Sequence, residues 1–488
     1  MNYKMTGRFI AQIIAIEGVF MLPALAISLF CKEYNAAWGF VYTIAIIAAV
    51  AGILFALCRK AKTVFGARDG MASVGLSWIT LSLLGCLPFV FSGEIPQYID
   101  AFFEIVSGFT TTGASIVPDI EAMSKGLVYW RSFSHWLGGM GVLVFLLAIA
   151  PSGEGDKGFT MHLLRAESPG PDVGKLAPKM RQTALILYLI YIGLTVINVV
   201  FLLLGDMPLF DAVCTAFGTA GTGGFGIKNN SMADYGTYLQ GVTTVFMLLF
   251  GINFSCYYLL LLRQFKAVFK DEELRLYVII VLASILLITL NVWYGMKDAY
   301  DTLWETAHHA AFQVSSIITT TGYSTTDFNL WPGFTKGILL TLMVIGACAG
   351  STGGGIKVAR VLLVFKSLRR NIRQVLNPRK VMVVRNNGKV VNENTVTTVN
   401  AYLAAYVIIV VIMFLLLSLD KYDVETNLSA LLACFNNIGP GLAQVGPYAN
   451  FAGYSGFSKI ILSIGMLAGR LEIFPILTLL SRSTWKKR

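Results

Sequence analysis

Long apolar stretches constrain the fold of this chain more than any other feature. About 20 apolar residues cross the hydrocarbon core of a bilayer as a helix. Only 13% of the residues are charged, against about 25% in soluble domains. The first stretch contains Glu17 and is followed at once by a second, which favours a retained helix over a cleaved signal. We expect an all-α integral membrane protein whose ten transmembrane helices lie at 9–30, 37–58, 72–92, 134–151, 184–204, 237–262, 276–295, 334–368, 396–419 and 457–480.

Basic residues are distributed unevenly between these stretches. If both termini lie inside, the inner segments carry 29 of the 38 Lys and Arg residues, the outer segments carry eight, and Arg470 lies within the last stretch. Cytoplasmic loops of membrane proteins hold the excess of basic residues, so both termini are expected to be cytoplasmic. A net charge of +11 can also indicate nucleic-acid binding. A basic cytoplasmic face is the simpler explanation, and no nucleic-acid partner is expected.

The reactive residue types give no sign of an enzyme. The seven cysteines are scattered without a C-x-x-C pair, and the chain has only four histidines. This pattern supports neither a disulfide framework nor a zinc site. No clustered Ser/His/Asp or Cys/His set is present either, so we expect no covalent chemistry.

Four shorter segments between pairs of stretches share one pattern. Each starts with about ten residues of helical character and ends in a small, polar strip around a glycine. The glycines are 111, 98 and 117 residues apart. A unit of span, half-helix, loop and span therefore occurs four times, after two extra helices. The segments are DAFFEIVSGFTTTGAS (100–115, Gly113), DAVCTAFGTAGTGGFG (211–226, Gly224), HAAFQVSSIITTTGYS (309–324, Gly322) and TNLSALLACFNNIGPG (426–441, Gly439).

The physics of the bilayer suggests what such a unit does. Non-helical backbone at membrane depth is tolerated where it lines a polar cavity. A ring of backbone carbonyls can replace the hydration shell of a monovalent cation. Glycine allows the required backbone angles, threonine hydroxyls add oxygen ligands, and the negative end of each half-helix favours a cation. The four segments therefore predict four re-entrant pore half-helices around one cation pore.

Acidic residues gather at the outer ends of these segments. They could concentrate cations at the mouth of the pore. Alternatively, each could stabilise the N-terminus of its half-helix. The residues are Asp100, Glu104, Asp211, Asp301, Glu305, Asp423 and Glu425.

Over nearly its whole length the chain resembles the Trk/Ktr/HKT superfamily of potassium transporters, specifically the bacterial TrkH/TrkG type. The resemblance implies potassium uptake across the bacterial inner membrane and four pseudo-symmetric, covalently linked repeats. The motifs that carry it are SGFTTTGAS (107–115), HWLGGMGV (135–142), TGGFG (222–226), SIITTTGYST (316–325), GACAGSTGGGIKVAR (346–360), FNNIGPGL (435–442) and GRLEIFP (469–475). The implied boundaries are 1–66 for the extra helices, then 67–152, 153–263, 264–390 and 391–488 for repeats one to four.

The same resemblance implies a selectivity filter built from all four loops. Potassium is then the transported ligand, and no organic cofactor is expected. The fourth loop has Asn437 and Ile438 where the first and third have two threonines, which leaves its number of side-chain ligands open. The implied filter residues are Thr111, Thr112, Gly113, Ala114, Thr222, Gly223, Gly224, Phe225, Thr320, Thr321, Gly322, Tyr323, Asn437, Ile438, Gly439 and Pro440.

Two further features lie within the later stretches. GACAGSTGGGIK (346–357) lacks the G-K-[ST] of a phosphate loop, and its five glycines predict either a helix break or close helix packing. The resemblance implies an intramembrane gating loop containing Gly350, Gly353, Gly354, Gly355 and Lys357. Arg470, midway along the last stretch, must face a partner or a polar pathway. It is either one half of a salt bridge to another helix or, by the resemblance, an electrostatic barrier below the filter.

Partners follow from the resemblance as well. It implies a cytoplasmic, nucleotide-binding regulatory subunit of the TrkA type and a homodimer with one pore per chain. The basic segment 366–389 and the C-terminal KKR could dock that subunit or membrane lipid headgroups. The rival function is coupled secondary transport of a small solute, although all four units start from the same side. Whether transport is passive or coupled to protons or sodium stays open, and His308 and His309 are assigned no role beyond starting a half-helix.

Overall fold

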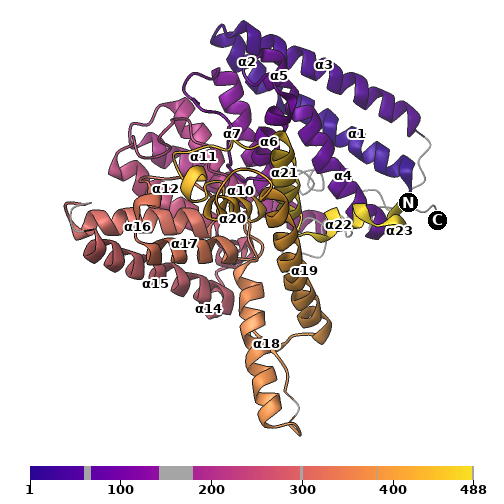
Figure 1. The fold of residues 1–488 in the computed structure, drawn as a ribbon. Coiled ribbons are helices and arrows are strands. Elements are labelled where there is room, and N and C mark those ends of the chain that lie inside the picture. The colour runs from indigo at the N-terminus through magenta and orange to yellow at the C-terminus, as the bar shows by residue number, and fades with distance from the viewer. Residues whose placement is uncertain (60–66, 142–179, 297–299, 381, 486–488) are drawn as a thin grey trace.

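The computed structural model describes residues 1–59, 67–141, 180–296, 300–380 and 382–485. These residues are mostly helical (Figure 1) and contain one short antiparallel hairpin, β1 (Arg385–Asn386) and β2 (Lys389–Val390). Within them, six segments are long and apolar enough to cross a membrane. A seventh is added if the bent pair Thr237–Phe250 and Phe254–Leu261 is one span. The expected multi-pass helical membrane protein is confirmed.

Two antiparallel spans precede the rest of the chain. The first consists of α1 (Tyr3–Phe20) and α2 (Leu22–Phe30), with Pro23 in the first turn of α2; the second is α3 (Tyr34–Leu57). Helix α1 packs on both α3 and α4, and α2 packs on α7. The described ends of the chain meet, because the Tyr3 hydroxyl donates to the carbonyl oxygen of Trp485 at 2.5 Å. Both ends therefore lie on one side of the molecule (Figure 1).

The remainder repeats one order of helices four times. A long helix is followed by a short helix of 12–16 residues, a loop, and a second helix of 13–15 residues. Helix α5 (Leu87–Ser92) extends α4 beyond a break at Cys86. The four sets are α4 (Ala67–Gly85), α6 (Tyr98–Phe109) and α7 (Lys125–Gly139); α10 (Met180–Leu203), α11 (Leu209–Gly221) and α12 (Thr237–Phe250); α15 (Glu272–Gly295), α16 (Leu303–Ile318) and α17 (Gly333–Ile345); and α19 (Glu393–Leu417), α20 (Val424–Phe435) and α21 (Gly456–Arg470).

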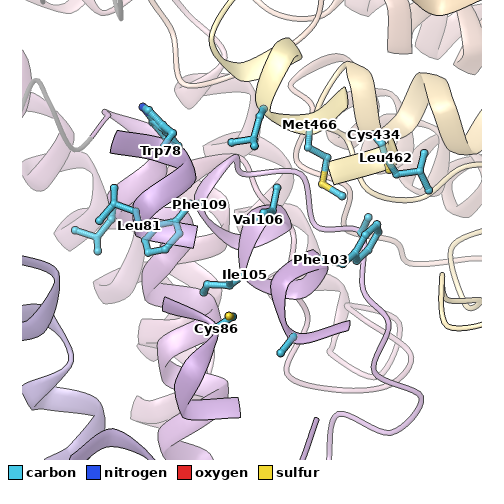
Figure 2. Packing of buried hydrophobic residues seen from close by; sticks show 14 of the residues in the cluster. Trp78, Leu81, Cys86, Phe103, Ile105, Val106, Phe109, Cys434, Leu462 and Met466 are labelled. Atoms are coloured by element: carbon cyan, nitrogen blue, oxygen red, sulfur yellow. The ribbon is translucent and has the colours of Figure 1, made fainter. Parts of the chain in front are cut away.

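The four short helices pack in a closed ring. Each contacts both helices of its own set and the second helix of the preceding set: α6 packs on α21, α11 on α7, α16 on α12 and α20 on α17. Apolar side chains of α6 fill the seam between the first and last sets. In Figure 2, Phe109 of α6 lies beside Leu81 of α4 and Ile105 lies beside Cys86, whereas Val106 and Phe103 lie on the side of Met466 and Leu462 of α21. The last set therefore closes onto the first.

Several expected spans are not single helices. Stretch 237–262 bends by 90° between α12 and α13 (Phe254–Leu261), and 457–480 breaks after Arg470, before α22 (Phe474–Leu480). Stretch 334–368 is interrupted between α17 and α18 (Val358–Leu376), where the glycines predict a break. A helix of 13–15 residues is only about 20 Å long, shorter than a core of about 30 Å. From residue 142, the expected span 134–151 lies outside the described residues.

The outward faces of the long helices are apolar and exposed. Leu189 on α10, Leu282 on α15 and Leu415 on α19 are each about 60% exposed. Such side chains are stable on a lipid-facing surface, where no water contacts them. Helices α18 and α19 project from the body together (Figure 1), and the β-hairpin lies between them in the chain. The remaining short elements are α14 (Phe265–Lys270), α23 (Arg482–Trp485), η1 (Phe328–Leu330) and η2 (Ala443–Val445).

Candidate functional site

The loops after α6, α11, α16 and α20 share one backbone shape. We name residues 110–115, 221–226, 319–324 and 436–441 glycine loops 1 to 4. In each, a residue in the left-handed region is followed two positions later by a glycine with positive φ. The left-handed residues are Thr111, Thr222, Thr320 and Asn437, with φ of 56°, 55°, 58° and 58°. The glycines are Gly113, Gly224, Gly322 and Gly439, with φ of 80°, 73°, 87° and 99°.

One hydrogen-bond pattern produces this shape. The amide that follows each left-handed residue donates to a carbonyl five residues back, at 2.8 Å in all four loops. This is the bond of a Schellman helix ending. Three of the left-handed residues are threonines, which rarely adopt that conformation. The surrounding contacts must therefore hold them there, as happens at functional sites.

The loops fit against one another with no space for a side chain at the glycines. A Cβ on Gly113 would lie 2.0 Å from the carbonyl oxygen of Gly223, and one on Gly224 would lie 1.9 Å from that of Thr321. On Gly322 it would lie 2.0 Å from the oxygen of Ile438. A Cβ on Gly439 would lie 2.7 Å from the oxygen of Thr112, in the first loop. The four loops thus form one closed ring in chain order.

Loop 4 differs in sequence, and its asparagine forms the last contact of the ring. Asn437 donates through its side-chain amide to the Thr112 hydroxyl at 3.0 Å and to the carbonyl oxygen of Met466 at 2.9 Å. The side chain that replaces a threonine therefore ties loop 4 to loop 1. Ile438 is fully buried and contributes its carbonyl to the contact with Gly322.

All four ring glycines line one hollow that opens to solvent. Its described lining includes the basic residues Arg131 and Lys228 and no Asp or Glu. The outer loops of the first two sets meet at its rim, where Asn229 donates to Asp119 at 2.9 Å and accepts from the amide of Ile120 at 2.8 Å. The bond from Asn229 lowers the pKa of the exposed Asp119 carboxyl. None of the seven acidic residues at the outer ends of the pore segments lines this hollow.

Three of these acidic residues have structural contacts. Glu104 is fully buried and binds Arg131 at 2.6 Å, so of its two alternatives the attraction of cations at the mouth is excluded. Asp100 binds Lys459 at 2.6 Å. Glu305 accepts from the amide of Asp301 at 3.1 Å, as a helix-capping residue does. For this residue the alternative of helix stabilisation describes the structure.

The residues after the ring glycines are fixed in different ways. Tyr323 is buried and its hydroxyl donates to the carbonyl oxygen of Thr215 on α11 at 3.2 Å. Phe225 lies against the side chains of Arg131 and His135 of α7. The sequence patterns did not single out Glu104, Arg131 and His135 as one cluster. A signal for this cluster was nevertheless present, because Glu104 is a charged residue inside an apolar half-helix and Arg131 is one inside the helix that follows it.

Segment 346–357 contacts the ring at the end away from the hollow. The amide of Gly354 donates to the Thr320 hydroxyl at 2.6 Å. A Cβ on Gly354 would lie 2.3 Å from the carbonyl oxygen of Asn436, and one on Gly353 would lie 2.9 Å from that of Thr319. The structure therefore brings this segment directly against loops 3 and 4.

Long charged side chains anchor the same segment. Arg470 donates to the carbonyl oxygen of Thr352 at 2.7 Å and to that of Gly139 at 2.6 Å, so it joins the segment to the end of α7. Glu273 accepts from the amide of Ala349 at 2.5 Å. Lys357 is buried and donates to the carbonyl oxygen of Gly353. These contacts bring the sequence-predicted residues of 350–357 together with Arg470.

Arg470 is placed differently from the expectation. It is the last residue of α21 rather than the middle of a continuous helix, because Glu472 and Ile473 adopt positive φ of 57° and 67°. Glu472 forms an ion pair with Arg360 of α18. His308 and His309 likewise lie within α16, after its first turn, rather than at its start.

Comparison with known proteins places these features in a family. The sequence profile of the TrkH family, described as cation transport protein, matches residues 37–487. The Trk system potassium uptake protein TrkH of Salmonella typhimurium is 34% identical, with full coverage of both chains. TrkG of Escherichia coli K12 is 33% identical over 96% of this chain and 95% of its own. The crystal structure of the potassium transporter TrkH from Vibrio parahaemolyticus superimposes with a TM-score of 0.88, at 31% identity and full coverage of both chains.

Proposed function

The chain belongs to the TrkH family of cation transport proteins, and we propose that it takes up potassium ions through a pore formed by the four glycine loops. The closed ring of loops is the observation that supports this most strongly. Backbone carbonyls of each loop abut the glycine of the preceding loop. A fourfold set of such carbonyls can replace the hydration shell of a potassium ion. No covalent chemistry is required, and the family is one of transport proteins rather than enzymes.

We infer that ten transmembrane helices and four re-entrant half-helices, α6, α11, α16 and α20, build this pore. The repeats are those bounded at 67–152, 153–263, 264–390 and 391–488, with residues 1–66 added outside the ring. The half-helices direct their negative C-terminal ends toward the ring, where they favour a cation. With the basic segments inside, both termini are cytoplasmic and the protein resides in the bacterial inner membrane.

The filter consists of the left-handed residue, the ring glycine and the residues beside them in every loop. Thr111 has no hydrogen-bond partner for its hydroxyl among the described residues, so this oxygen is available as a ligand. In loop 4 the side-chain nitrogen of Asn437 donates to loop 1, whereas its side-chain oxygen has no hydrogen-bond partner among the described residues and is available as a ligand in place of a hydroxyl. The filter is therefore pseudo-symmetric.

We further propose that segment 346–357 is the gate. It lies against the ring and, together with Arg470, blocks the path at the lower end. Lys357 and Arg470 place two positive charges beside this path, which raises the energy of a cation there. Displacing the segment opens the pore.

The force for that displacement is assigned to a partner. A cytoplasmic, nucleotide-binding regulatory subunit of the TrkA type would dock on projecting helix α18 and the basic segment 366–389. The far end of α18 stands clear of the helical body (Figure 1), whereas the β-hairpin contacts the start of α15, where Asn387 donates to Asp271 at 2.8 Å. We also propose a homodimer with one pore per chain, whose inner surface contacts anionic lipid.

The proposal is tested in a bacterial strain that lacks its own potassium uptake systems. Expression of the chain with its regulatory subunit should restore growth at low potassium. The purified proteins in liposomes should carry potassium or rubidium down an imposed gradient. The absence of both growth and ion flux would contradict the proposal. Varying the ion and voltage gradients separates passive conduction from coupling to protons or sodium.

A further inference from the structure

We propose that Arg131 and His135 of α7 are positioning residues that clamp Phe225 and thereby fix the selectivity of glycine loop 2. This inference rests on the proposed function, since it assumes that the loops form the filter. Neither residue belongs to a glycine loop, and both lie on one face of α7 a helical turn apart. Their contacts converge on the residue that directly follows Gly224.

His135 joins loop 2 to the first short helix. Its Nδ1 lies 2.8 Å from the carbonyl oxygen of Gly108 on α6, and its Nε2 lies 3.2 Å from the amide nitrogen of Phe225. A carbonyl accepts and an amide donates, so Nδ1 carries the proton, Nε2 accepts, and the imidazole is neutral. The fully buried ring also packs on the Phe225 ring, with centroids 4.2 Å apart.

Arg131 covers the same aromatic ring. Its guanidinium lies 3.9 Å from the Phe225 centroid, within the range of a cation–π contact. Glu104 binds the guanidinium at 2.6 Å, and Arg131 also donates to the Ser115 hydroxyl of loop 1 at 3.2 Å. The arginine is thus fixed by the first unit while it contacts the second.

Loop 2 needs this clamp because it lacks a brace that two other loops contain. In loop 1 the hydroxyls of Thr110 and Thr112 are 2.8 Å apart, and in loop 3 those of Thr319 and Thr321 are 2.8 Å apart. These hydrogen bonds tie the first and third residues of each loop together. The corresponding residues of loop 2 are both glycines and have no side chain to supply such a bond.

His135 occupies the space that the missing side chains would fill. A Cβ on Gly223 would lie 2.3 Å from the imidazole of His135, and one on Gly221 would lie 2.3 Å from the carbonyl oxygen of the same residue. Glycine is the most flexible residue, so loop 2 would otherwise be the least constrained of the four. The Gly223 carbonyl abuts Gly113, and its displacement would widen the ring between loops 1 and 2.

Two substitutions of His135 separate its two bonds. His135→Asn places an amide N–H where Nδ1 was, so it keeps the bond to Gly108 and loses the one to Phe225. His135→Gln can place its carbonyl oxygen where Nε2 was and keep the acceptor for Phe225. The matched control is His308→Gln. His308 bonds the Gln240 side chain at 2.8 Å and, unlike His135, has no bond to a glycine loop among the described residues. A second probe, Phe225→Leu, removes the aromatic side chain that Arg131 and His135 enclose.

The measurement is the ratio of initial rubidium and sodium uptake rates in cells that express each variant with the regulatory subunit. His135→Asn should lower the rubidium-to-sodium ratio about tenfold, the scale of one buried amide left unpaired. His135→Gln should restore most of the ratio, and His308→Gln should match the unaltered protein. Phe225→Leu should lower the ratio even if His135→Asn does not reach the membrane.

The outcomes distinguish the clamp from the proposed function. If the unaltered protein carries neither ion, the proposed function fails and the clamp fails with it. If it is selective for rubidium and both His135→Asn and Phe225→Leu keep its ratio, the clamp alone is overturned. If His135→Asn and Phe225→Leu both lower rubidium uptake without changing the rubidium-to-sodium ratio, the role of these residues is purely structural. That result would also overturn the clamp.

Discussion

The glycine loops and segment 346–357 are both non-helical and glycine-rich, yet charged side chains from other helices anchor only the segment directly through its backbone. In the ring, backbone abuts backbone, and a Cβ on any of the four glycines would lie within 2.7 Å of the next loop. Segment 346–357 also has backbone contacts, such as the bond from the Cys348 amide to the carbonyl oxygen of Gly251. In addition, the ends of two long side chains from other helices, Arg470 and Glu273, bind its carbonyl and amide groups. Close backbone contact fixes carbonyl positions, as ion discrimination requires. Side-chain anchors can be released without breaking a helix, as a gate requires.

The largest effect is expected from Gly322→Ser in the ring. The new Cβ would meet the carbonyl oxygen of Ile438, and Gly322 has φ of 87°, which a serine rarely adopts. Discrimination against sodium should fall by about tenfold or more, since several kcal/mol of strain must be relieved by moving carbonyls. Sodium inhibition of rubidium uptake measures it. Gly337→Ser on α17 is the control, because a Cβ there meets nothing within 4 Å, and unchanged selectivity in Gly322→Ser would contradict the filter assignment.

Next comes Arg470→Met, which removes an anchor and a positive charge from the gate. Rubidium uptake without the regulatory subunit should rise about fivefold, the consequence of roughly 1 kcal/mol in favour of the open state. Arg470→Lys keeps the charge and should stay closer to the unaltered protein. Equal leak in both variants would show that the charge is not a barrier, and a leak in neither would show that the contact with Thr352 does not hold the segment.

A smaller effect is expected at Glu273, the acidic anchor. Glu273→Ala leaves the buried amide of Ala349 without its acceptor, at a cost of about 1–3 kcal/mol, and should loosen the segment. Glu273→Gln retains an acceptor and should leak less than the alanine variant. Uptake in liposomes containing the transport subunit alone distinguishes them. If the alanine variant does not leak, the backbone contacts of 346–357 are enough to keep the segment in place.

The smallest effect is expected where the two regions meet. Thr320→Val removes the hydroxyl that accepts from Gly354, whereas Thr111→Val alters the equivalent position in loop 1, whose hydroxyl has no partner among the described residues. Both changes remove a potential ion ligand, so their effects on rubidium affinity should be similar. Only Thr320→Val should raise rubidium uptake in the absence of the regulatory subunit. The expected rise is about twofold, which is smaller than the loss of a full hydrogen bond would produce. Equal leaks would remove the proposed link between ring and gate.

Much of this comparison was predictable from the sequence. Apolar length indicated the six single spans that the described residues contain, and the spacing of Gly113, Gly224, Gly322 and Gly439 indicated four equivalent loops. The five glycines of 346–355 predicted the interruption after α17, because each weakens a helix. These are local signals that require no knowledge of packing.

Other features depend on contacts between distant residues. The sharp bend after α12 lies at residues 251–253, where the carbonyl oxygen of Gly251 accepts from the amide of Cys348, nearly a hundred residues away. Glu104 appeared to be an acid at the mouth because its partner, Arg131, belongs to another helix. The role of His135 becomes apparent only from the structure, where its imidazole packs against Gly223 and leaves no space there for a side chain. Tertiary packing, not local propensity, decides such positions.

The most direct test of the central claim is to locate rubidium by anomalous scattering in crystals of the protein. If the four glycine loops form one filter, rubidium should lie on the axis of the ring, within coordination distance of carbonyl oxygens from all four loops. Soaking with sodium in its place should abolish the peak. Ordered rubidium only at other positions, with an empty ring, would contradict the account.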